Sequence, residues 1–86
     1  MTKEELQILY SKVVEYIRNY DSYHVWYTCG EETWSADGQS VTFEVFGYSD
    51  QDEGADWTEY WGIDSNGIHS EDKIWKTFDE FKRDFI

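Results

Sequence analysis

Hydrophobic residues near the N-terminus recur at intervals of three and four, the spacing of one face of a helix. They are Leu6, Leu9, Tyr10, Val13, Ile17 and Tyr20. Thr2 and Glu5 precede this stripe as T-x-x-E, a capping box in which each side chain accepts a free backbone N–H group at the helix start. The pattern predicts an amphipathic helix from about Lys3 to Tyr20, with the stripe packed on the core.

From Tyr23 onward the hydrophobic period changes to two, which is typical of β-strands. One side of the predicted strand carries Val25, Tyr27 and Cys29, and the other side carries His24, Trp26 and Thr28. Gly30 interrupts the alternation and predicts a turn or a bulge, after which the strand resumes from Thr33 to Ala36.

Asp37-Gly38 predicts a two-residue hairpin turn, because both central positions of a type I′ turn need a positive φ. The returning strand is expected from about Gln39 to Tyr48. Its core side carries Val41, Phe43 and Val45, and its other side carries Thr42, Glu44, Phe46 and Tyr48. The pairs expected across the turn are Trp34 with Val41 and Ala36 with Gln39.

A third strand is predicted from Trp57 to Ile63, and Asp64-Ser65-Asn66-Gly67 ends it with a second hairpin signal. Two interpretations remain for the residues that follow Gly67. Residues 70–72 could open a helix whose stripe is Ile74, Phe78, Phe81 and Phe85. Alternatively, a last strand runs from Ile68 to Lys76, and T-F-D-E from Thr77 is a second capping box that starts a short helix to Ile86. The Asn-Gly turn favours the second interpretation.

These elements predict one α+β domain over residues 1–86, with an N-terminal helix, an antiparallel meander of three to four strands and a short C-terminal helix in two layers. The helices cover one face of the sheet. The other face then carries Trp26, Phe46, Tyr48 and Tyr60 at least partly exposed, as an interaction surface would.

The charged residues are unevenly distributed along the chain. The 86 residues carry a net charge of −12, and 5 Trp, 7 Tyr and 5 Phe argue for a folded chain. The cations are Lys3, Lys12, Arg18, Lys73, Lys76, Lys82 and Arg83. Between Asn19 and Asp72 there are thirteen acids and no cation, so the whole excess of negative charge lies there. Such a segment repels nucleic acid and anionic lipid and attracts basic surfaces.

The acids are densest from Ser49 to Trp61, which reads S-D-Q-D-E-G-A-D-W-T-E-Y-W. We expect this stretch to bind a partner. The predicted charged contacts are Asp50, Asp52, Glu53, Asp56 and Glu59, and the predicted aromatic anchors are Trp57, Tyr60 and Trp61. Carboxylates on alternate strand positions lie about 6.6 Å apart, an array comparable with the phosphates of a nucleic acid.

Catalytic and metal chemistry find little support in the sequence. In an EF-hand register from Asp50, position six is Ala55 rather than glycine, and a register from Ser49 begins with serine. His24 and His69 are predicted to be ordinary polar residues, and no nucleophile motif surrounds Cys29. We expect no enzyme activity and no catalytic, cofactor-binding or metal-binding residue.

A few further features of the sequence bear on the cellular compartment and the oligomeric state. A single cysteine cannot form an intrachain disulfide and favours a reducing, cytoplasmic setting. Neither a signal peptide nor a membrane-spanning apolar run is recognised in the sequence. Exposed strand edges at Tyr23–Cys29 or Trp57–Ile63 make a homodimer an alternative to a monomer.

In size, charge and expected α+β sheet the chain resembles the small acidic phage inhibitor proteins of the DNA-mimic type, which include anti-CRISPR proteins and uracil-DNA glycosylase inhibitors. A local likeness to the glycosylase inhibitors lies in Trp61–Lys76, where I-D-S-N-G is followed by K-I-W-K, and it covers under a fifth of the chain. Their contact motif has no counterpart elsewhere, so no functional residue is carried over. The resemblance implies a protein that occupies the DNA-binding cleft of a host enzyme.

The sequence thus favours a small acidic module that binds a basic protein surface, such as a nucleic-acid-binding cleft, and that contacts neither nucleic acid nor membrane itself. Two alternatives stay open. The chain could be an immunity or antitoxin-like protein that neutralises a basic toxin. It could also be a housekeeping domain whose acids only keep it soluble.

Overall fold

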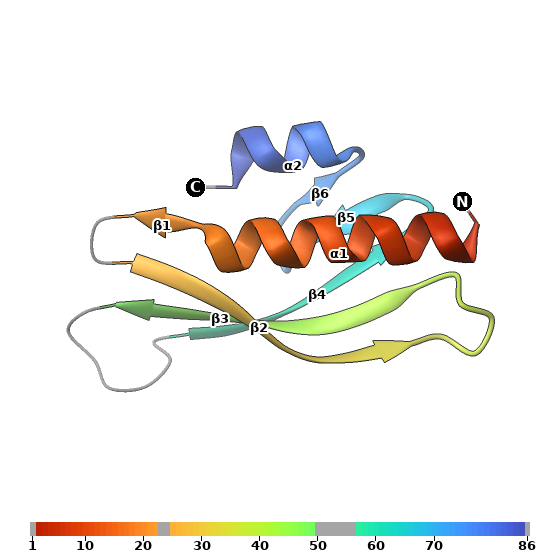
Figure 1. The fold of residues 1–86 in the computed structure, drawn as a ribbon, viewed down its shortest axis with the longest axis horizontal. Coiled ribbons are helices and arrows are strands. Elements are labelled where there is room, and N and C mark those ends of the chain that lie inside the picture. The colour runs from red at the N-terminus through yellow and green to blue at the C-terminus, as the bar shows by residue number, and fades with distance from the viewer. Residues whose placement is uncertain (1, 23–24, 50–56, 86) are drawn as a thin grey trace.

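Two helices lie on one side of an antiparallel sheet in the computed structural model, which describes residues 2–22, 25–49 and 57–85 (Figure 1). The elements in chain order are α1 (Lys3–Asn19), β1 (Asp21–Ser22), β2 (Val25–Trp34), β3 (Val41–Ser49), β4 (Trp57–Asp64), β5 (Gly67–His69), β6 (Ile74–Trp75) and α2 (Phe78–Asp84). The described strands form one sheet in the order β1-β2-β3-β4-β5-β6, with every neighbouring pair antiparallel. The predicted α+β fold is confirmed, and short strands extend the meander beyond its three long ones.

Helix α1 begins as the sequence predicts. The Thr2 hydroxyl accepts the Glu5 N–H at 3.1 Å, and the Glu5 carboxylate accepts the Thr2 N–H at 3.0 Å. These hydrogen bonds hold the pKa of the Glu5 carboxyl below its usual range, and the bond from the Thr2 backbone has the largest effect. The buried stripe of the helix consists of Leu6, Val13, Val14 and Ile17.

Strands β2 and β3 pair around a bulge, as Gly30 predicts. The register shifts between Cys29 and Glu32, so the ladder is interrupted at residues 30–31. The Arg18 guanidinium, in the last turn of α1, donates to the Cys29 carbonyl at 3.3 Å. A side chain from α1 therefore satisfies a carbonyl group beside the interruption.

The hairpin between β2 and β3 is wider than predicted. Trp34 does pair with Val41, but the last backbone bond is donated by Ser35 N to the Ser40 carbonyl, which leaves residues 36–39 as a four-residue loop without the expected pairing of Ala36 with Gln39. Gly38, at φ +71°, donates to the Ser35 carbonyl and so closes the turn instead of occupying its centre. Asp37 accepts from the Ser35 hydroxyl and the Gln39 N–H, and these local bonds favour the wider loop.

The C-terminal third follows the second interpretation with one correction. The segment predicted as a single strand, Ile68–Lys76, is two short strands, β5 and β6, on either side of a turn over residues 70–73. Ser70 stabilises this turn, because its N–H donates to the Lys73 carbonyl and its hydroxyl accepts from the Asp72 and Lys73 N–H groups. The alternative prediction, a helix that opens at residues 70–72, is therefore wrong.

Helix α2 begins at the second T-x-x-E motif. The Thr77 hydroxyl accepts the Glu80 N–H at 3.1 Å, as expected for an N-cap. The Glu80 carboxylate, however, accepts the Lys76 N–H at 2.8 Å. Glu80 thus ties the helix start to the residue that follows β6.

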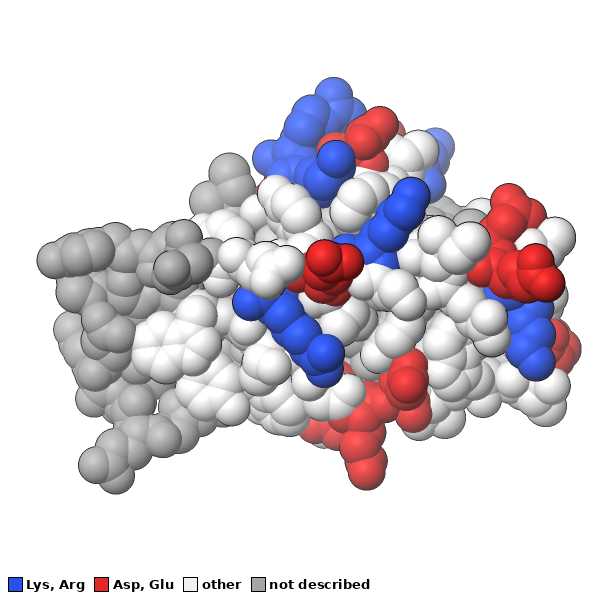
Figure 2. Space-filling view, viewed as in Figure 1, with Lys and Arg blue, Asp and Glu red and all other residues white. Residues whose placement is uncertain are grey.

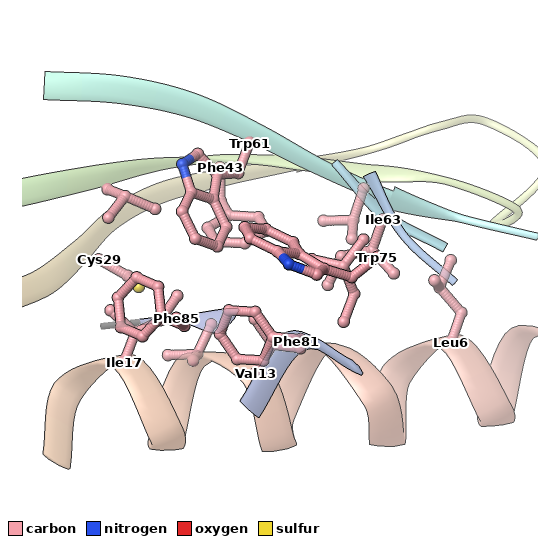
Figure 3. Packing of buried hydrophobic residues seen from close by; sticks show 14 residues of the cluster. Leu6, Val13, Ile17, Cys29, Phe43, Trp61, Ile63, Trp75, Phe81 and Phe85 are labelled. Atoms are coloured by element: carbon pink, nitrogen blue, oxygen red, sulfur yellow. The ribbon is translucent and has the colours of Figure 1, made fainter. Parts of the chain in front are cut away.

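The core lies between the sheet and both helices and is unusually aromatic in its C-terminal part (Figure 3). Phe81 of α2 is fully buried, and its ring lies 5.3 Å from Trp75, 5.9 Å from Trp61 and 5.1 Å from Phe85, between ring centroids. Val41, Phe43 and Val45 are buried beneath α1 on the predicted face of β3. None of the helices formed by the described residues has the length and apolar character of a membrane span.

Cys29 belongs to this core, and burial raises the pKa of its thiol to about 11. We expect native Cys29 to react with iodoacetamide at neutral pH at least about a hundredfold more slowly than the unfolded chain, because only the thiolate is nucleophilic. Alkylation followed by intact mass, with and without guanidinium, measures this ratio. Equal rates in the two conditions would show that the thiol is accessible in the native state.

Candidate protein-interaction surface

Strand β4 divides the predicted binding residues between two faces of the sheet. Side chains alternate along it, so Trp57 and Glu59 share the helix side with the buried Trp61 and Ile63. Tyr60 points to the opposite side, where it is paired with Glu44 of β3. The described part of the predicted stretch, Trp57–Trp61, is therefore divided between the two faces of the sheet.

Trp61 is corrected from an exposed anchor to a core residue. Its side chain is 4% exposed, and its ring packs 5.4 Å from Trp75 and 5.9 Å from Phe81. Helix α2 and β6 cover this part of the sheet, and burial of so large an apolar ring stabilises the fold. Trp61 is thus not available for a partner.

The acidic loop contributes no geometry to the site. Asp50, Asp52, Glu53 and Asp56 lie outside the residues that the structure describes. Their predicted role as charged contacts stays a prediction from the sequence. Of the eight predicted binding residues, Trp57, Glu59 and Tyr60 are described and at least partly exposed.

The sheet face turned away from the helices carries a group of aromatic side chains, which we call the outer aromatic face: Trp26, Phe46, Tyr48 and Tyr60. Trp26 and Tyr48 are cross-strand partners whose rings stack at 5.8 Å between centroids and 3° between planes. Tyr60 is 68% exposed and Trp26 40% exposed. The two parallel rings therefore form one contiguous aromatic patch that joins β2 and β3.

Phe46 occupies the middle of this face because Gly30 makes room for it. A Cβ atom at position 30 would come within 2.6 Å of Cε2 of the Phe46 ring. The bulge glycine therefore allows a large ring to lie close to the backbone of β2. Phe46 is half-buried as a result.

Acids and threonines fill the rest of the outer face. Glu31, Thr33, Thr42, Glu44 and Tyr60 surround a small hollow of about 90 Å³. Strands β2, β3 and β4 contain no Lys or Arg. An aromatic surface with carboxylates and no cation is complementary to a basic surface with apolar contacts.

The cations lie elsewhere on the molecule. Figure 2 shows Lys and Arg gathered over α2 and along α1, on the helix side of the domain. Glu71 also lies near the sheet, where its carboxylate accepts the Tyr60 N–H at 3.0 Å. This bond satisfies a donor of β4 at the edge that β5 leaves uncovered.

His69, predicted to be an ordinary polar residue, has a local partner on the neighbouring strand. His69 Nε2 lies 2.9 Å from Asp64 Oδ1 across the β4–β5 hairpin. Partial burial raises the pKa of Asp64, but the hydrogen bonds from His69 and the Asn66 N–H outweigh burial and lower the pKa overall. Within the described part of the chain no group of three His, Cys, Asp or Glu residues could hold a metal ion.

Fold and surface together define a two-layer α+β domain with a helix-covered sheet whose outer face is aromatic and acidic. Comparison of the chain with protein-family models, curated proteins and solved structures finds no match. Glu31 and Glu44 were not among the predicted binding residues, although the two-residue alternation already placed Glu44 on the outer face.

Proposed function

We propose that this chain is an acidic protein-binding module that covers a basic, nucleic-acid-binding surface of a partner protein and thereby inhibits it. The observation that carries the proposal is the outer aromatic face, which combines exposed rings with carboxylates and lacks cations. The rings would supply desolvated contacts in the centre of an interface, where binding energy concentrates. The carboxylates would attract the partner and stand in place of phosphates.

The charge of the chain supports the same partner chemistry. A net charge of −12 on 86 residues accelerates association with a basic protein and slows association with nucleic acid or anionic lipid. Four of the thirteen acids of the cation-free segment lie in residues 50–56, next to β4 in sequence. Added salt should therefore weaken binding steeply.

The proposal is tested by capturing partners from a cell lysate on the immobilised chain and competing them with duplex DNA. We expect a basic nucleic-acid-binding protein to be retained at low salt and released by DNA or by high salt. Tyr60→Ala and Glu44→Lys should each lower the affinity of the purified partner at least about tenfold, since both alter the proposed contact surface. Ile74→Ala is a matched control, because Ile74 is exposed but lies on edge strand β6.

Other results would contradict the proposal in identifiable ways. A captured toxin that DNA does not displace would indicate an immunity protein. Partner binding that is unchanged by both Tyr60→Ala and Glu44→Lys would show that the outer aromatic face is not the interface. Unchanged binding after reversal of Asp50, Asp52 and Asp56 to lysine would limit the acidic loop to a solubilising role.

A further inference from the structure

A groove on the helix side of the sheet is separate from the outer aromatic face. It has a volume of about 280 Å³ and is bordered by residues far apart in sequence, among them Tyr27 of β2, Trp57 of β4, Trp75 of β6 and Phe85 at the end of α2. The groove therefore exists only when α2 and the β5–β6 hairpin are folded against the sheet.

The aromatic walls of the groove are held in place by their neighbours. The Trp57 indole covers Gly47, its cross-strand partner, so closely that a Cβ atom at position 47 would collide with the ring. Tyr27 meets Trp57 edge-to-face at 5.8 Å and contacts Phe85 at 5.1 Å, between centroids. Trp57 nevertheless remains 38% exposed and borders the groove.

Two carboxylates on the groove are oriented by buried indoles. Trp61 Nε1 donates to Glu59 Oε1 at 3.3 Å, and Trp75 Nε1 donates to Asp84 Oδ2 at 3.2 Å. The two indoles are in contact, with 5.4 Å between ring centroids, so both carboxylates are fixed beside one aromatic cluster. The ion pairs among the described residues are His69–Asp64 and Lys82–Asp79, which leaves Glu59 and Asp84 without a cationic partner there.

The net negative charge of the residues that line the groove favours a cation as its ligand. Glu59, Asp72 and Asp84 carry three negative charges against the one positive charge of Lys73. An anion would be repelled, and an apolar group would remove oriented carboxylates from water without replacing their hydrogen bonds.

We propose that this groove binds the guanidinium group of an arginine side chain presented by a partner protein. A planar guanidinium can stack on the exposed part of Trp57 and donate to Glu59 and Asp84 at the same time. An ammonium group lacks the flat face and the fork of donors that this combination uses. The inference does not rest on the outer aromatic face, so either proposal can fail while the other holds.

The test uses the whole chain and a short blocked probe peptide, acetyl-Gly-Arg-Gly-amide. Its control peptides contain citrulline, an uncharged isostere, or lysine in place of arginine. Titration is followed through the indole Nε1–H resonances of Trp57, Trp61 and Trp75 in ¹H–¹⁵N spectra. We expect saturable shifts at millimolar concentration with the arginine peptide, at least about tenfold weaker binding with lysine, and none with citrulline.

Glu59→Gln and Asp84→Asn test the carboxylates without removing the acceptors of the indole N–H groups. Each should weaken binding of the arginine peptide at least about tenfold, since the guanidinium loses a hydrogen bond to a charged acceptor. Glu44→Gln, on the outer face, makes the same change of charge and should leave affinity within about twofold. The dispersion of the same spectra shows that each variant is folded.

Three results would overturn the inference. One is an arginine peptide that shifts no indole resonance. A second is equal binding of the arginine and lysine or citrulline peptides. The third is a loss of affinity in Glu44→Gln as large as in Glu59→Gln, which would mean that net charge alone attracts the probe.

Discussion

Phe81→Ala is expected to lower the free energy of unfolding by about 3–5 kcal/mol, the largest effect of any single substitution considered for this chain. For a domain of this size the melting temperature should fall by more than about 10 °C. Urea unfolding followed by circular dichroism measures the change. Because small domains are stable by only about 5–15 kcal/mol in total, the variant should be partly unfolded at elevated temperature.

The reason is the position of the ring at the centre of the aromatic core. Phe81 is fully buried and contacts Tyr16 of α1, Trp61 of β4 and Trp75 of β6, so its removal leaves a cavity between three elements. Phe78→Ala is the control, because Phe78 lies one turn earlier and is only half-buried. We expect a loss of about 1 kcal/mol there. Equal losses in the two variants would show that α2 is not packed as described.

Gly67→Ala is expected to destabilise the chain by at least about 2 kcal/mol, through backbone strain rather than loss of contacts. Gly67 has a φ of +127°, which residues with a Cβ atom rarely adopt. A Cβ atom at this position would also collide with the Trp75 carbonyl oxygen on the neighbouring part of the chain. The substitution should therefore disturb the β5–β6 pairing and, with it, the groove beside Trp75.

Gly62→Ala provides the comparison on the adjacent strand. A Cβ atom at position 62 would lie 3.5 Å from the Val41 carbonyl oxygen, an ordinary contact. We expect a change within about 1 kcal/mol, because the lower entropy of the unfolded chain offsets small adjustments. Thermal unfolding of both variants measures the difference. A Gly67→Ala variant as stable as Gly62→Ala would contradict the role given to the backbone of Gly67.

Local chemistry explains which parts of the fold could be predicted. The Thr2–Glu5 capping box and the helical stripe determine α1 within a few residues of chain. The pairing of Trp34 with Val41 follows from the distance of each residue from the turn. The predicted two-residue width of that turn is wrong, because the Ser35 hydroxyl and the Asp37 carboxylate accept the Gln39 N–H and pair with each other, which competes with the pattern that Asp37-Gly38 favours.

Tertiary contacts explain what could not be predicted. Trp61 is buried because α2 and β6 fold over it, although alternation with Ile63 already placed both on one side of the strand. Glu59 and Asp84 both line the groove, although 25 positions of sequence separate them. Spacing along the chain carries no signal for such a pair. Only the packing of α2 on the sheet brings them together.

Placement of the cations on the helices and around β6 gives the domain an electric dipole in addition to its net charge. A dipole in the field of a charged partner experiences a torque, so the domain should rotate during approach and arrive with its cation-free sheet foremost. Orientation before contact reduces the share of unproductive collisions. Two copies of the chain would be held apart by their common negative charge yet turned with the helices of one toward the sheet of the other.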